Sequence, residues 1–276
     1  MCSSDLGKRF VSENPATGKP IAEIAEGGAA DVDIAVAAAR KAADDGRWSR
    51  LSPNERKQIL VRWANLLEEH GREISLLETI DSGKPIGDTI GIDVPETAHC
   101  IRWHAEAADK LYGQVAPSPE GTVATVTREP LGVVGLVIPW NYPLLMAAWK
   151  LGPSLATGNT VVIKPASATS LSLLRAAELA TEAGLPDGVL NVVTGPGGSV
   201  GEAIGRHMGI DGLAFTGSTE VGRRFLAYSG ESNLKRVSLE LGGKSPQLVF
   251  PDAPDWAAVA AQVAIAIFWK IGRAHV

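Results

Sequence analysis

Four polar residues stand at the ends of short apolar runs, where a side chain can act on a bound ligand. If these runs are parallel strands, their carboxyl ends meet at one edge of a sheet, and ligands collect there. An amide can donate to an oxyanion, a carboxylate can act as a general base, and the N–H groups at a helix start favour a phosphate. The residues that together predict such a site are Asn141 after LVIPW, Lys164 at the end of VVIK, Ser218 after FTG, and Glu240 in LELGG.

Two of these residues also have simpler interpretations. Asn141 could cap the helix that follows it, and Glu240 could be a solvated strand end. We expect apolar surroundings for Glu240, because Leu239 and Leu241 flank it in the sequence.

Helical patterns fill residues 31–112, ahead of these strands. The tetrapeptide from Ser52 to Glu55 is a capping box with proline at the first helical position. Apolar spacing then marks the helices. We expect Val32–Ala43 behind an Asp31 cap, a helix from Ser52 to a stop at Gly71 with Leu60, Trp63 and Leu67 on one face, and a helix from about Pro95 to Leu111.

From Thr122 the pattern changes to strands that alternate with helices, which is typical of βαβ units and a mainly parallel sheet. We therefore predict an α/β protein with a doubly wound, Rossmann-like sheet behind an N-terminal helical region. The expected strands are 131–138, 160–164, 189–193, 212–215, 235–240 and 247–250, and the expected helices are 143–156, 170–184, 198–207 and 219–228.

Three patterns imitate other sites. The turn Gly195–Gly198 lacks the third glycine of a dinucleotide fingerprint, because Val200 stands there. The GGKS run at Gly242 lacks the first glycine of a P-loop, because Ser238 stands there. His99 and Cys100 point about 100° apart on a helix, so we expect no metal site.

The composition excludes two classes of partner. The 276 residues are 45% hydrophobic and 21% charged, with a formal net charge of −5 and no basic run, which argues against a nucleic-acid surface. No apolar stretch reaches the roughly 20 residues that span a bilayer. We therefore expect a cytoplasmic protein with no nucleic-acid or membrane partner. Apart from Cys2, only Cys100 could form a disulfide, which fits a reducing compartment.

Both termini resemble sequencing-adaptor read-through. Residues 2–6 can be encoded by TGCTCTTCCGATCT, and residues 270–274 by its reverse complement preceded by one base. Ordinary termini remain the alternative. We expect residues 1–7 and 270–276 to be adaptor-derived and exclude them from the fold.

Four phrases in fixed order resemble the aldehyde dehydrogenase superfamily in wording and spacing: LVIPWNYPL from Leu136, VVIKPA from Val161, FTGSTEVG from Phe215 and LELGGKSP from Leu239. The resemblance runs from about Asn14 to Trp269. The family's nucleophilic cysteine follows an FFNxGQ-like segment, and Phe268-Trp269 looks like its start. The resemblance thus implies an incomplete aldehyde dehydrogenase fold, truncated before its nucleophile.

The resemblance implies a role for each site residue. Asn141 would stabilise the oxyanion, and Glu240 would be the general base for thioester hydrolysis. The cofactor would be NAD, with NADP possible because Ser167 replaces a glutamate that many NAD-preferring members carry. The implied cofactor contacts are Ile138, Trp140, Lys164, Ser167, Gly195, Pro196, Gly217, Ser218 and Gly242.

The substrate implied by the resemblance is an aldehyde. Tyr142, Met146 and Trp149 fall at i, i+4 and i+7, and the family lines its substrate tunnel from these positions, although such a stripe is also typical of core packing. The phrases IRWHAEAADKLYG and GLPDGVLNVVTG look like amino-aldehyde members of the gamma-glutamyl-gamma-aminobutyraldehyde and betaine aldehyde types. Asp93 and Glu96 could attract a cationic substrate or be solvated helix-start carboxylates.

The resemblance also implies a division of the chain and a homodimer or homotetramer for the intact enzyme. The expected parts are an N-terminal helical part (8–112), an oligomerisation strand region (113–130), the NAD(P)-binding domain (131–242) and the start of the catalytic domain (243–269). Two alternatives stay open: a naturally short, non-catalytic nucleotide-binding module, and an acyl-CoA-forming relative. Glu240 counts against the second, which needs no deacylation base.

Overall fold

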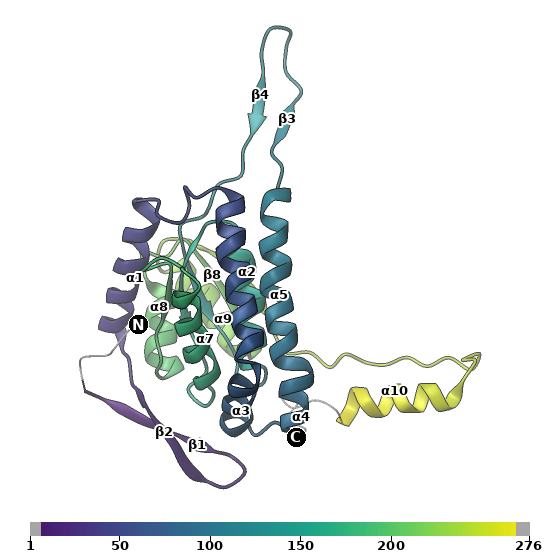
Figure 1. The fold of residues 1–276 in the computed structure, drawn as a ribbon. Coiled ribbons are helices and arrows are strands. Elements are labelled where there is room, and N and C mark those ends of the chain that lie inside the picture. The colour runs from purple at the N-terminus through teal and green to yellow at the C-terminus, as the bar shows by residue number, and fades with distance from the viewer. Residues whose placement is uncertain (1–6, 269–276) are drawn as a thin grey trace.

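The computed structural model describes residues 7–268, and a five-stranded parallel sheet lies at its centre (Figure 1). The order is β7-β6-β5-β8-β9, so the first strand is central and the chain winds outwards from it in both directions. This is the predicted doubly wound architecture. The strands are β5 (Val133–Val137), β6 (Thr160–Lys164), β7 (Leu190–Val192), β8 (Gly212–Thr216) and β9 (Arg236–Glu240).

Helices cover both faces of the sheet. Along β5, Val134 and Leu136 belong to a core cluster shared with side chains of α2, α5, α6 and α7, whereas Val133 and Val137 belong to a second cluster shared with α1, α8 and α9. With both faces covered, β5 is a continuous apolar run rather than an alternating one. The helices are α1 (Ala29–Asp44), α2 (Pro53–Glu69), α5 (Val94–Ala107), α6 (Pro143–Ala156), α7 (Leu171–Glu182), α8 (Glu202–Arg206) and α9 (Thr219–Gly230).

The N-terminal helices form as predicted except at two boundaries. Ser52 and Glu55 make the expected capping box at the start of α2. Asp31 is not the cap of α1, because Gly28 occupies that position and donates its N–H to the Asp31 carboxylate (2.8 Å). The helix that was predicted to stop at Gly71 ends at Glu69, and Gly71 begins a further helix. The remaining helical segments are α3 (Gly71–Ser82), α4 (Ile86–Asp88), η1 (Thr89–Asp93), η2 (Ala108–Lys110) and η3 (Gly197–Gly201).

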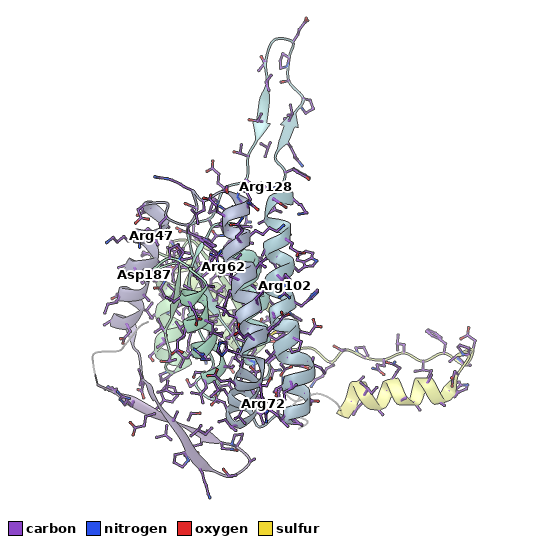
Figure 2. All side chains as sticks on the ribbon, in the orientation of Figure 1. Arg47, Arg62, Arg72, Arg102, Arg128 and Asp187 are labelled. Carbon is purple, nitrogen blue, oxygen red and sulfur yellow. The ribbon has the colours of Figure 1, made fainter. Side chains whose placement is uncertain are left out.

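An exposed ion pair joins two of these helices on the outer surface. Arg102 of α5 donates to both carboxylate oxygens of Glu68 on α2, at 2.8 and 2.7 Å. Figure 2 labels Arg102 on the layer of helices that includes α2 and α5. A bidentate pair of this kind fixes the orientation of the two helices more than it stabilises them.

Two hairpins and a C-terminal arm leave the central body (Figure 1). The first hairpin, β1 (Arg9–Asn14) with β2 (Lys19–Ala25), was not predicted. The second pairs β3 (Gln114–Ala116) with β4 (Ala124–Val126) in the segment predicted to be extended. The expected strand at 247–250 does not form, because no strand of the described residues pairs with it. The chain continues exposed into α10 (Trp256–Phe268); the Trp269 position of the predicted motif lies outside the described residues.

Trp63 is expected to be a principal support of the helical layer. Its side chain is 2% exposed, and its Nε1 donates to the carbonyl oxygen of Ala176 on α7 (2.9 Å). Replacement by alanine leaves a cavity and should lower the free energy of unfolding by about 3–5 kcal/mol. Trp103 on α5 is 56% exposed, so Trp103→Ala should change it by less than about 0.5 kcal/mol. Urea denaturation of both variants checks this; equal losses would contradict it.

Candidate functional site

One cavity of about 940 Å³ opens at the carboxyl ends of β5, β6, β8 and β9. It lies where the winding direction reverses between β5 and β8, the place where doubly wound sheets bind ligands. Asn141 reaches it from the loop after β5, and Glu240 from the end of β9. Residues that are 99 positions apart in the sequence are thus brought to one pocket by the strand order.

The cavity gathers most of the residues that the sequence singled out, and three lie outside its lining. Those that line it are Ile138, Trp140, Asn141, Met146, Trp149, Lys164, Ser167, Gly217, Ser218, Glu240 and Gly242. Those that do not are Tyr142, Gly195 and Pro196.

Gly195 packs closely against another backbone segment outside the cavity lining. Its φ is +136°, and a Cβ there would lie 2.7 Å from the carbonyl oxygen of Gly27. The glycine is therefore required for the close approach of two backbone segments. The next glycines, Gly197 and Gly198, line the cavity in its place, with open space around them.

Tyr142 is held against a different cluster. It is the N-cap residue of α6, with φ −136°, so it does not share the helical face of Met146 and Trp149. Its ring centroid lies 3.7 Å from Lys84 Nζ, and burial raises the pKa of its hydroxyl to about 12. Lys84 also pairs with Asp93, which is buried at 1% exposure and is neither solvated nor at an entrance.

The N-cap position of Tyr142 also bears on Asn141. The sequence allowed Asn141 to be the cap of the following helix, but that position belongs to Tyr142. Asn141 is half-buried and contributes to the cavity wall instead.

A buried cation and a helix start form the other side of the cavity. Lys164 is 3% exposed, its Nζ donates to the carbonyl oxygen of Pro165 (2.7 Å), and burial lowers its pKa to about 8. Ser218 is the N-cap of α9 and accepts from the N–H of Val221 (3.3 Å). The positive end of the α9 dipole therefore faces the cavity wall and suits an anionic group.

Glu240 is exposed at the end of β9, not surrounded by apolar groups as expected. Successive side chains of a strand point to opposite faces, so Leu239 lies on the other side of the sheet from Glu240. The backbone oxygen of Glu240 accepts the N–H of Gly217 (3.0 Å), which ties the β9 end to the start of α9.

Lys150, a buried lysine on α6, was not predicted from the sequence. Its Nζ donates to Thr216 Oγ1 (2.6 Å) at the end of β8. Burial lowers the pKa of Lys150, and the negative charge of Glu240 partly opposes this shift. A lysine in the apolar segment LLMAAWKLG was the available signal, since an unpaired lysine is rarely buried.

Other classes of site are not built in the described part of the chain. Burial raises the pKa of the Cys100 thiol to about 11, which disfavours a reactive thiolate. Within residues 7–268 no three His, Cys, Asp or Glu side chains gather so as to hold a metal ion. None of the helices in that range has both the length and the apolar character to cross a bilayer.

The fold and the cavity define a doubly wound α/β domain with a ligand site at the carboxyl edge of its sheet. The sequence profile described as Aldehyde dehydrogenase family matches residues 2–274, and the chain belongs to this family. The family predicted from the four phrases is thus confirmed.

Known relatives agree with this assignment. The chain is 54% identical over 267 residues to an aminoacetaldehyde dehydrogenase of Pseudomonas aeruginosa, covering 97% of this chain and 54% of that protein. It is 50% identical over 264 residues to the NADP/NAD-dependent aldehyde dehydrogenase PuuC of Escherichia coli, covering 96% and 53%. A structure of P. syringae indole-3-acetaldehyde dehydrogenase in complex with NAD+ matches with a TM-score of 0.94 at 51% identity, covering 95% and 53%. The chain therefore spans about half of the length of these relatives.

Proposed function

We propose that this chain supplies the cofactor site and two catalytic side chains of an NAD(P)-dependent aldehyde dehydrogenase. The observation that carries the proposal is the meeting of Asn141 and Glu240 in one cavity with Lys164 and the start of α9. The relatives' names support the reaction class. A cysteine thiolate from the remaining half of such an enzyme would complete the site.

The proposed reaction needs a thiolate, an oxyanion donor, a hydride acceptor and a base. The thiolate adds to the aldehyde carbon, and the Asn141 amide donates to the oxygen, which becomes negative. When bound, the oxidised nicotinamide accepts the hydride with its electron pair, leaving a thioester. Glu240 then takes a proton from water, which attacks the thioester, releases the carboxylic acid and regenerates the cysteine thiolate, and the protonated Glu240 afterwards returns its proton to solvent.

The cavity residues suit a dinucleotide. The volume of the cavity, about 940 Å³, is at the upper end of the usual range for ligand sites. Lys164 would donate to ribose hydroxyls, and the N-terminus of α9 at Ser218 would bind the pyrophosphate. Gly197 and Gly198 leave open space for the adenosine end.

The proposed substrate is an aldehyde of moderate size, with amino-aldehydes favoured by the aminoacetaldehyde-oxidising relative. Trp149 is 56% exposed and Met146 lines the cavity beside Asn141, so these side chains would form one wall of the substrate entry. Tyr142 would lie behind this wall, because it does not line the cavity.

We also propose the domain roles expected from the sequence. The β3–β4 hairpin would be the oligomerisation element of a homodimer or homotetramer, because Val115 and Val123 expose apolar side chains on it (74% and 78%). Residues from 243 onwards would begin the catalytic domain, and a cytoplasmic location would fit the composition.

The proposal is tested with a chimera that continues residue 268 of this chain with the C-terminal half of the Pseudomonas aeruginosa relative. We expect NADH formation with aminoacetaldehyde from the chimera and none from the 276-residue chain alone, whose Cys100 lies outside the cavity lining and has a thiol pKa that burial raises to about 11. A soluble, folded chimera that binds NAD but oxidises no aldehyde would favour the rival function, a non-catalytic nucleotide-binding module.

Cofactor preference gives a second test. Ser167 lines the cavity near Lys164, and its Oγ donates to the Gly195 carbonyl oxygen (2.8 Å). Ser167→Glu should weaken NADP binding relative to NAD by about tenfold or more, because a carboxylate repels the 2′-phosphate. Ser167→Gln, similar in size but neutral, should not. Calorimetric titration of both cofactors checks this, and equal effects of Glu and Gln would contradict it.

A further inference from the structure

The helices α6 and α7 begin without a cap of their own. In α2 and α9 the N-cap residues Ser52 and Ser218 accept a hydrogen bond from a backbone N–H of the first turn. The N-cap residues of α6 and α7, Tyr142 and Ser170, make no such side-chain bond. The free N–H groups at these helix starts need another acceptor.

Both acceptors come from a single helix, α3. Glu78 Oε2 accepts from the N–H of Leu144 in α6 (3.3 Å), and Asp81 Oδ2 accepts from the N–H of Leu171 in α7 (2.9 Å). The two carboxylates are three residues apart, so they share one face of α3. They are 0% and 3% exposed, which makes them an interior feature and not surface charges.

The helix starts held in this way are the ends of two cavity loops. Residues 138–142 connect β5 to α6 and carry Asn141, whereas residues 165–170 connect β6 to α7 and carry Ser167. Neither Glu78 nor Asp81 lines the large cavity. Asp81 lines a smaller neighbouring cavity that shares Trp140 and Ser167 with the large one, so it meets the large cavity only through residues of these two loops.

We propose that Glu78 and Asp81 are positioning residues: from adjacent turns of α3 they hold the first turns of α6 and α7, and so set the places of Asn141 and Ser167. The part of this proposal that concerns catalysis rests on the proposed function. The part that concerns capping of the two helices does not depend on the proposed function.

The surroundings of Glu78 favour its neutral form. Asp93 of η1 lies near Glu78 and pairs with Lys84, whose ammonium also covers the Tyr142 ring. Burial, followed by the charge of Asp93, raises the pKa of Glu78 to about 8. A protonated carboxyl still has an acceptor oxygen, so the bond to the Leu144 N–H does not require a charged Glu78.

Amide hydrogen exchange of the 276-residue chain tests the capping. Glu78→Ala should speed exchange in peptides covering 139–148 by roughly 5- to 30-fold, the factor that corresponds to losing one N-cap. Peptides covering 166–174 should be unchanged. Asp81→Ala should speed exchange in the peptides covering 166–174 and leave those covering 139–148 unchanged. Glu78→Gln and Asp81→Asn keep an acceptor oxygen and should restore most of the protection.

A purely structural role would give a different result. Equal acceleration in both peptides and in strands β5 and β6, or no acceleration in either peptide, would overturn the proposal. If an alanine variant does not fold, the amide variants decide: local protection near the wild-type level in both loops supports capping by an acceptor oxygen, whereas local loss with Gln or Asn contradicts it.

Kinetics of the chimera test the link to catalysis. Glu78→Ala should lower kcat at least fivefold with little change in the KM for NAD, whereas Asp81→Ala should mainly raise that KM. If exchange separates as expected but the unsubstituted chimera is inactive, the capping stands and the proposed function fails. If the chimera is active and the two variants change kcat and KM alike, the positioning role fails.

Discussion

Glu240→Gln in the chimera is expected to lower the steady-state rate of aldehyde oxidation by roughly 10²- to 10⁴-fold, the usual contribution of a general base. Gln cannot take the proton of the attacking water, so the thioester should persist. The first turnover does not need this base. A burst of about one NADH per site should therefore remain, followed by almost no further formation.

Stopped-flow absorbance of NADH separates these phases. Glu178→Gln is the matched control, because Glu178 is an exposed carboxylate on α7 that pairs with Arg175 and does not line the cavity. The control should keep both phases. Loss of the burst together with the steady state in Glu240→Gln would mean that Glu240 acts before hydride transfer, against the role proposed here.

Asn141→Ala should have the second large effect, and on the opposite phase. Removing one oxyanion donor typically costs about 10²- to 10³-fold in rate. The burst itself should slow by this factor, because the oxyanion forms before hydride transfer. The affinity for NAD should stay close to that of the unsubstituted chimera.

Stability is the control for Asn141→Ala. If the side chain only supported the start of α6, the variant would unfold more easily, by about 1 kcal/mol, and its burst rate would be normal. Tyr142, not Asn141, is the N-cap residue of α6, so we expect the reverse. A normal burst with reduced stability would contradict the oxyanion role.

The central sheet could be predicted because its strands are continuous apolar runs, such as VVGLV and TVVIK, that both helical layers cover. The segment QLVF at 247–250 has the same composition and yet no strand forms there. Strand formation depends on a partner as much as on composition. In the described residues that segment has no neighbouring strand.

The site was predictable where residues stand at the carboxyl ends of parallel strands, because these ends meet at one edge of the sheet. Asn141 and Glu240 follow strands whose order brings them together, so their meeting could be foreseen. Tyr142 could not be placed by helical spacing, because the helix begins one residue after it. Glu78 and Asp81 left no local signal either, since their partners are 66 and 90 residues away.

Amide hydrogen exchange of the chimera with and without NAD tests the central claim most directly, because it reports where the cofactor binds without requiring turnover. Saturating NAD should protect the segments 138–142, 164–168 and 215–221, which form the cavity wall after β5, β6 and β8. The β3–β4 hairpin should be unaffected. Saturable protection confined to other segments, or none at all in a folded chimera, would contradict the account.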